Sequence, residues 1–253
     1  MESLTPFLWT AAIGIAFGAG LIKGSIGFAL PLVMISGLST FVDPRLALAG
    51  LILPVLLTNG MQILRAGAGP AVAATAENWR YVLMVVLAIL LAGQVVTAIP
   101  RQVFYFVLGI PVVILSVLQL AGWVLTIPKA RRRAAEWGIG AISGVLGGLV
   151  GTWGPTTVLY LMAIETPKDR QMVVQGVIYG IGSVALLVAH LASGVLNAST
   201  IWFSAAMLGP AVIGMAIGLR LSDRMDQARF RKLTLVVLVV AGLNLIRKGL
   251  EGA

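Results

Sequence analysis

Charged residues interrupt this chain so rarely that most of it falls into uncharged runs of about twenty residues. Between residues 3 and 64, for example, the charged residues are Lys23, Asp43 and Arg45 alone. An apolar run of about 20 residues is long enough to cross the hydrocarbon core of a bilayer as a helix. The pattern therefore predicts a membrane protein, because a single core in water could not bury so many adjacent apolar segments.

The composition supports this prediction and excludes several other classes of protein. Hydrophobic residues make up 59% of the 253 residues and charged residues 11%, whereas soluble domains carry about a quarter charged residues. The formal net charge of +9 is interpreted as an excess of Lys and Arg that sets the orientation of the chain in the membrane. No nucleic-acid partner is therefore expected. With no cysteine and one histidine, neither a metal site nor a cofactor is expected. The few acidic residues offer no catalytic pair, which disfavours an enzyme.

Charged residues, glycine and proline divide the chain into ten segments that predict helices. The expected fold class is all-α, a polytopic membrane protein. Five segments fall in the first half, 1–128, at about 4–22, 24–41, 46–65, 78–99 and 101–127. Five more fall in the second half, 129–253, at about 135–151, 152–165, 170–195, 199–220 and 231–249. A loop of small residues is expected at 66–76.

The two halves repeat at a spacing of about 127 residues, which aligns Gly20, Gly24 and Gly27 with Gly147, Gly151 and Gly154. Each half begins with two short segments joined at a glycine cluster, which predicts a broken or re-entrant hairpin followed by three transmembrane helices. Because five segments is an odd number, the second half enters the membrane from the opposite face. Inverted repeats are typical of secondary transporters, whose substrate site lies near the midplane.

The basic residues predict the orientation, because short cytoplasmic loops retain Lys and Arg. Placing 129–133 inside puts thirteen of the eighteen basic residues inside and four outside, with Lys23 unassigned. The charged turns at Arg45 and Arg170 then lie on opposite faces, and both termini face outward.

The glycine clusters also carry a resemblance to a known family. The first half has Gly24-Ser25-Ile26-Gly27-Phe28 with Pro31, and the second has Gly147, Gly148, Gly151 and Gly154-Pro155. These motifs resemble those of the TauE/SafE family of membrane anion permeases, also called sulfite exporters or 4-toluene sulfonyl uptake permeases. The resemblance covers nearly the whole chain and implies a multi-pass transporter of the bacterial inner membrane for sulfite, sulfonates, sulfoacetate or small carboxylates. The departures from the family pattern are Lys23, Ser25, Thr152 and Trp153.

Lys23 is the one basic residue that has no place in a loop. A lysine at the bilayer centre costs about 2.5–3.5 kcal/mol by insertion scales, and no acidic residue is near it in sequence. An anionic substrate is the partner expected for it. The alternative is that Lys23 lies at an aqueous hairpin tip or snorkels to one.

The glycines admit two interpretations. Small residues four apart allow helices to pack closely in lipid. Alternatively, the clusters unwind the backbone at membrane depth and present N–H groups to an anion. In the second case Gly24, Gly27, Gly151 and Gly154 line the substrate site.

Nearby polar side chains complete the candidate site. Ser25, Thr152 and Thr156 offer hydroxyls and Trp153 an indole N–H, although Ser and Thr in membrane helices often bond their own backbone. The remaining candidates lie in later segments: Asn59, Gln175, Tyr179 and His190.

These later candidates also have two interpretations each. Asn59 and Gln175 either bind substrate or join helices. Tyr179 shares a helix face with Gln175 and either binds substrate with it or serves packing or an interfacial aromatic belt. His190 is either a proton carrier or a side chain that reaches the membrane interface.

The sequence thus predicts a secondary transporter that exports small sulfur-containing anions by alternating access at a midplane site. A passive anion channel, a carboxylate permease and a scaffold subunit are the alternatives. The expected partners are a small anion and the lipid bilayer, with a proton as a candidate coupling ion.

Overall fold

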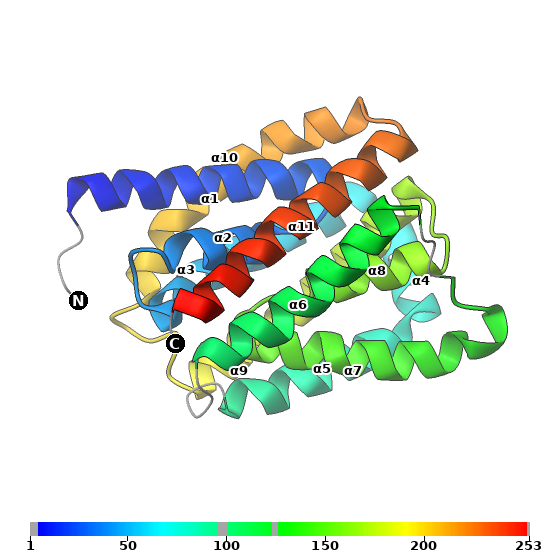
Figure 1. Cartoon of the computed structure of the whole chain (residues 1–253), viewed down its shortest axis with the longest axis horizontal. Coiled ribbons are helices and arrows are strands. Elements are labelled where there is room, and N and C mark those ends of the chain that lie inside the picture. Colours follow the sequence, from blue (N-terminus) through cyan, green and yellow to red (C-terminus); the bar gives the residue numbers. More distant parts are fainter. Residues whose placement is uncertain (1–4, 96–100, 123–125, 252–253) are drawn as a thin grey trace.

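The computed structural model describes residues 5–95, 101–122 and 126–251, and every regular element in these ranges is a helix. The all-α prediction is confirmed. The helices lie side by side as a bundle (Figure 1). Their bounds are α1 Pro6–Ile26, α2 Leu30–Leu38, α3 Pro44–Ala66, α4 Ala68–Glu77, α5 Trp79–Val95, α6 Arg101–Leu120, the 3-10 turn η1 Lys129–Arg131, α7 Arg132–Val150, α8 Gly154–Ala163, α9 Lys168–Ala192, α10 Ile201–Asp223 and α11 Gln227–Glu251.

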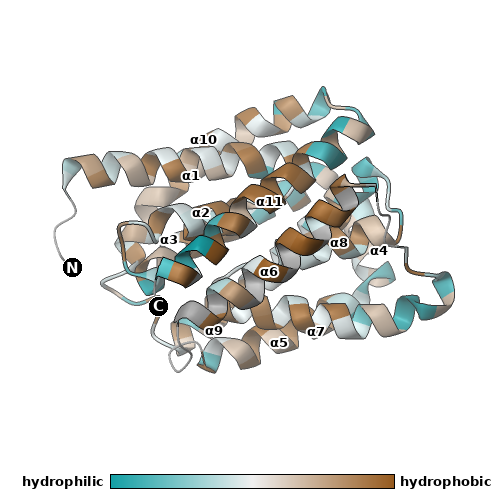
Figure 2. Cartoon of the chain, viewed as in Figure 1, coloured by the Kyte–Doolittle hydropathy of each residue, from teal (hydrophilic) through white to brown (hydrophobic). Residues whose placement is uncertain are grey.

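Several helices have the length and apolarity of membrane spans. Among the described residues these are α1, α3, α9, α10 and α11, and α4 with α5 make a sixth if the pair, bent by 81°, is taken as one span. Large apolar side chains such as Leu91, Trp202 and Val240 point outward from the bundle, and apolar residues run along the helices between more polar ends (Figure 2). Hydrocarbon is the solvent that suits such a surface, since helices satisfy their own backbone groups.

Two helix breaks interrupt the bundle, and each follows a glycine with positive φ. Gly27 (φ 84°) ends α1 and donates its N–H to the carbonyl of Lys23 at 2.7 Å. Gly151 (φ 69°) ends α7 and donates to the carbonyl of Gly147 at 2.8 Å. Only glycine adopts this left-handed conformation at little cost, so these two residues fix where the chain leaves each helix.

The positions of the breaks correct the sequence prediction in the first half. The boundary predicted at Lys23 is wrong, because α1 continues through Lys23, Gly24 and Ser25 to Ile26. The boundary predicted between 151 and 152 agrees with the end of α7 at Val150. The two terminating glycines are 124 residues apart (151 − 27), whereas the alignment at about 127 residues pairs Gly24 with Gly151.

The predicted small-residue loop at 66–76 is also wrong, because most of it forms α4. Alanine has the highest helix propensity, and five of the ten residues of α4 are alanine. Parts of two further predicted segments, 78–99 and 101–127, fall at 96–100 and 123–125, outside the described residues.

Small residues let pairs of helices approach through their backbones. A Cβ added to Gly20 or Gly24 of α1 would collide with the backbone of α10 at Ala211 or Met215. The same close approach joins α7 to α5, where a Cβ on Gly148 would lie 2.6 Å from the carbonyl oxygen of Ile89. The packing interpretation is confirmed for Gly20 and Gly24, as expected for association in lipid.

Polar residues gather at one end of the bundle, at the right of Figures 1 and 2, which we call the basic end. The segments that carry the thirteen basic residues counted above meet there: 65–80, 129–133, 168–170 and 220–232. The turn between α2 and α3 and the loop between α9 and α10 lie at the opposite end. Ion pairs join the helices at the basic end, Arg65 with Asp223, Arg170 with Glu77, and Arg80 with Glu136.

Replacing Gly20 by Ala tests the close approach of α1 to α10. The added methyl group must displace backbone, and overpacking of this kind costs about 1–3 kcal/mol. Gly18 is the matched control on the same helix, because a Cβ there would meet nothing within 4 Å. Thermal unfolding in detergent should show a lower melting temperature for Gly20→Ala and no loss for Gly18→Ala. Equal melting temperatures would show that α1 and α10 are not in backbone contact.

Candidate functional site

Lys23 is buried inside the bundle without a countercharge. Its side chain lies in the last turn of α1 and is 2% exposed. No ion pair in the described part of the chain includes it. The hairpin-tip interpretation is therefore wrong, and the ammonium stands among neutral groups.

Two amides of α3 hold this ammonium. Lys23 Nζ donates to Asn59 Oδ1 at 2.5 Å and to Gln62 Oε1 at 3.2 Å, and it lies 5.5 Å from the centre of the Tyr179 ring. The amide nitrogens are bound to α9, since Asn59 Nδ2 donates to the carbonyl of Tyr179 and Gln62 Nε2 to that of Met172, both at 2.9 Å. Because the nitrogens point to α9, both amide oxygens are left to face Lys23.

Gln175 of α9 stands on the other side of the first helix break. A Cβ on Gly27 would collide with Gln175 Oε1 and lie 2.6 Å from Met172 Sδ, so the turn at Gly27 presses directly on this face of α9. Gln175 is fully buried, and neither its Nε2 nor its Oε1 has a hydrogen-bond partner in the described structure. A buried unpaired polar group costs about 1–3 kcal/mol, so an additional partner for this amide would stabilise it.

The second helix break contributes two more unpaired donors. Thr152 Oγ1 and Trp153 Nε1 are buried without a partner among the described residues. The Trp153 ring meets Tyr179 edge-on, with ring centres 6.1 Å apart. Tyr179 OH donates to the carbonyl of Gly154 at 3.2 Å. Tyr179 therefore contacts both Lys23 of the first half and the break between α7 and α8 of the second.

We call the group that these contacts connect the central cluster. It joins five of the residues predicted from the sequence, the backbone carbonyl of a sixth, Gly154, and the unpredicted Gln62 and Met172. Its members from the prediction are Lys23, Gly27, Asn59, Gln175 and Tyr179, with Trp153 in contact through Tyr179.

Other predicted residues have different contacts. Gly24 packs on α10, and Ser25 donates its hydroxyl to the carbonyl of Leu21 at 2.9 Å. Gly151 faces leucine side chains of α3, and Gly154 faces Phe28. Thr156 bonds Ser143 at 2.5 Å and the carbonyl of Trp153 at 3.0 Å. Their side chains or added Cβ atoms thus meet packing neighbours rather than Lys23.

His190 lies far from the central cluster along α9. It follows Gln175 by fifteen residues, which is about 22 Å at 1.5 Å per residue. The ring is buried, with Nδ1 3.4 Å from Ser193 Oγ and Nε2 without a partner in the described structure. The interface interpretation does not fit a fully buried ring, and a coupling role stays a prediction.

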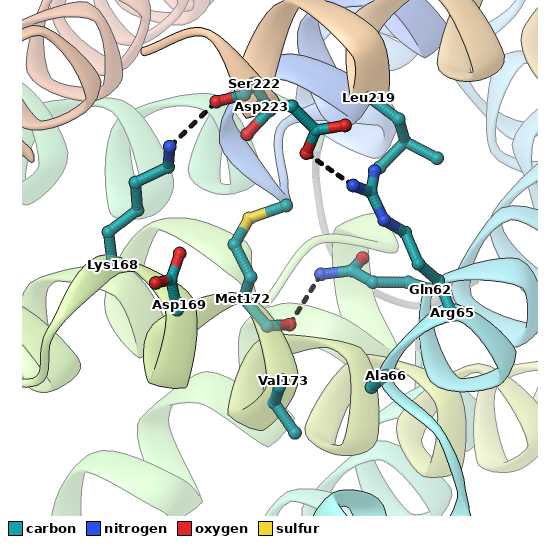
Figure 3. A pocket seen from close by; sticks show the side chains of 10 residues that line it. All are labelled: Gln62, Arg65, Ala66, Lys168, Asp169, Met172, Val173, Leu219, Ser222 and Asp223. Atoms are coloured by element: carbon teal, nitrogen blue, oxygen red, sulfur yellow. Dashed lines mark hydrogen bonds and ion pairs between the residues drawn. The ribbon is translucent and has the colours of Figure 1, made fainter. Parts of the chain in front are cut away.

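Gln62 is the residue that sequence reasoning missed. It follows Asn59 by three residues, a spacing that places both on one helix face. An amide next to a predicted site amide was therefore a usable signal. Gln62 also lines a cavity of about 290 Å³ at the basic end, between α3, α9 and α10 (Figure 3).

The fold and the central cluster define a class of protein. A buried lysine without a countercharge beside a helix break, inside a bundle of apolar helices, is the arrangement expected of a membrane transporter for anions. The chain matches the family described as Sulfite exporter TauE/SafE over residues 12–245, and it belongs to that family. It is a multi-pass membrane transport protein. Searches of curated proteins and of solved structures gave no match.

Replacing Gly27 by Ala tests whether the contact of the first break with Gln175 matters for the site. Gly194 is the matched control, because it has a similar φ of 74° but no atom within 4 Å of an added Cβ. Both substitutions incur the left-handed strain of about 1–2 kcal/mol, but only Gly27→Ala displaces Gln175. We expect Gly27→Ala to weaken sulfite binding by at least about tenfold, measured by calorimetry in detergent. Equal weakening in Gly194→Ala would contradict this.

Proposed function

We propose that this chain is a secondary transporter that exports small sulfur oxyanions such as sulfite, sulfonates or sulfoacetate. The observation that carries the proposal is the buried Lys23 ammonium, which has only neutral acceptors among the described residues. An anion would supply the missing countercharge and would offset the cost of about 2.5–3.5 kcal/mol for a lysine at membrane depth.

Lys23 and the unpaired donors near the two helix breaks suit an oxyanion. A sulfite or sulfonate group spreads its charge over three oxygens, so several donors in different directions bind it better than one. Lys23 Nζ, Gln175 Nε2, Trp153 Nε1 and the Thr152 hydroxyl are such donors, and three of them are unpaired. The family description supports sulfite as a substrate. Small carboxylates have similar chemistry and remain the alternative substrates.

Helix packing supports two inverted repeats, 1–128 and 129–253. If α1, α2, α3, α5 and α6 correspond to α7, α8, α9, α10 and α11, each main contact has a counterpart. Thus α1 packs on α10 as α7 packs on α5, and α3 packs on α10 as α9 packs on α5. Corresponding helices α6 and α11 lie side by side and run in opposite directions (Figure 1). The central cluster would lie between the repeats, as alternating access requires.

The orientation follows from the basic end. Because short cytoplasmic loops retain Lys and Arg, we place the basic end in the cytoplasm and both termini outside. The membrane would then be the inner membrane of a bacterium.

Replacing Lys23 by Met tests the proposed role of its charge. Methionine fills similar space without a charge, so transport of sulfite into or out of proteoliposomes should fall to background. Lys248→Met is the matched control, because Lys248 is also buried but lies in the last turn of α11. Sulfonates, carboxylates and chloride should be compared in the same vesicles. Normal transport by Lys23→Met would place the anion site elsewhere. Anion movement that occurs only down the imposed gradient would favour a channel.

Single cysteines test the inverted topology, since the chain has none of its own. Thr40, between α2 and α3, and Glu165, between α8 and α9, are both exposed. We expect an impermeant maleimide to label Thr40→Cys from outside the cell and Glu165→Cys from the cytoplasm only. Labelling of both from one side would exclude the inverted arrangement.

A further inference from the structure

A cavity at the basic end leads toward the central cluster. It lies between the C-terminal ends of α3 and α10 and the N-terminal end of α9, and has a volume of about 290 Å³ (Figure 3). Its lining residues are Gln62, Arg65, Ala66, Lys168, Asp169, Met172, Val173, Leu219, Ser222 and Asp223. The cavity therefore opens on the side that the basic residues assign to the cytoplasm.

Two of the lining side chains also contact the central cluster. Gln62 accepts a hydrogen bond from Lys23 Nζ at 3.2 Å. Met172 packs against the turn at Gly27, with its sulfur 2.6 Å from the place of an added Cβ. Gln62 Nε2 donates to the carbonyl of Met172 at 2.9 Å, which fixes the Gln62 side chain across the gap between α3 and α9. One layer of side chains thus separates the cavity from Lys23.

Three of the four charged residues that line the cavity have partners, and the fourth is Asp169. Arg65 pairs with Asp223 across α3 and α10. Lys168 Nζ donates to the carbonyls of Ser222 at 2.7 Å and Met225 at 2.5 Å, at the end of α10 (Figure 3 shows the bond to Ser222). These contacts hold α10 against α3 and α9 and form a rim. Beyond this rim, the next cation that an entering anion would meet is the ammonium of Lys23, behind Gln62.

We propose that this cavity is the cytoplasmic entrance to the anion site and that Gln62 is its gate. The proposal rests on the proposed function, in which Lys23 binds the anion. An incoming anion oxygen replaces Gln62 Oε1 on Lys23, so the ammonium keeps an acceptor while the gate opens. Rotation of one glutamine, with displacement of the flexible Met172 side chain, suffices to join cavity and site.

Cysteine labelling beside Lys23 tests the gate without relying on transport. The reporter is Asn59→Cys, which leaves the bond between Lys23 and Gln62 in place. The probe is sodium 2-sulfonatoethyl methanethiosulfonate, an anionic reagent that does not cross membranes, added separately to each face of oriented vesicles. Adding Gln62→Ala should raise the labelling rate from the basic end by at least about tenfold and leave labelling from the opposite face unchanged.

Two companion variants keep the test decisive. Arg65→Ala removes a cavity residue that does not contact Lys23, and it should change the rate by less than about twofold. Gln62→Glu places a carboxylate beside Lys23, and the ion pair should slow labelling below the rate of the reporter alone. An unchanged rate in Gln62→Ala, an equal rise in Arg65→Ala, or a rise from the opposite face would each overturn the gate.

The gate and the proposed function fail in different ways. If Lys23→Met still transports anions while Gln62→Ala opens the reporter to the basic end, the anion site is wrong and the gate stands. If Lys23→Met is inactive while Gln62→Ala leaves labelling unchanged, the site stands and the gate is overturned.

Discussion

The buried ammonium of Lys23 is the interaction on which the rest of this structure depends. It lies at membrane depth, and the acceptors that the described structure offers it are the neutral amide oxygens of Asn59 and Gln62. Neutral acceptors hold a cation in place without cancelling its charge, so an arriving anion still gains strongly by binding. A carboxylate in the same place would stabilise the protein more but would compete with the substrate. Under the proposed function, such an arrangement would select anions and still release them.

Two glycines determine where the chain breaks inside the bundle. Gly27 and Gly151 end α1 and α7 in the left-handed conformation, so the chain turns inside the bundle instead of at its surface. The first turn presses on Gln175, and the second presents Thr152 and Trp153. Close backbone packing of α1 on α10 and of α7 on α5 supports both breaks from outside. Polar groups at membrane depth are tolerated here because they are buried in protein rather than exposed to lipid.

Much of this could be predicted from the sequence, and the errors have a common physical origin. Uncharged runs gave the helices, and the unusual position of Lys23 led to the site, together with Asn59, Gln175 and Tyr179. The prediction treated all glycines of a cluster alike, although Gly24 serves packing and Gly27, three residues later, forms the turn. Gly24 lies within α1 and faces α10, whereas Gly27 lies just past the end of α1 and faces α9. Which glycine packs and which one turns the chain therefore depends on where the neighbouring helices lie. Gln62 was missed although its spacing from Asn59 places both on one helix face, and its contact with Lys23 of α1 shows only in the folded chain.

The most direct test of the account is a crystal structure with selenite, a heavier analogue of sulfite whose selenium can be located by anomalous scattering. The account predicts a selenium peak in the central cluster, with an oxygen within hydrogen-bonding distance of Lys23 Nζ and a second near Gln175 Nε2. Gln62 should then have released Lys23. A peak confined to the rim at Arg65 and Lys168, with Lys23 still bonded to Asn59 and Gln62, would contradict it.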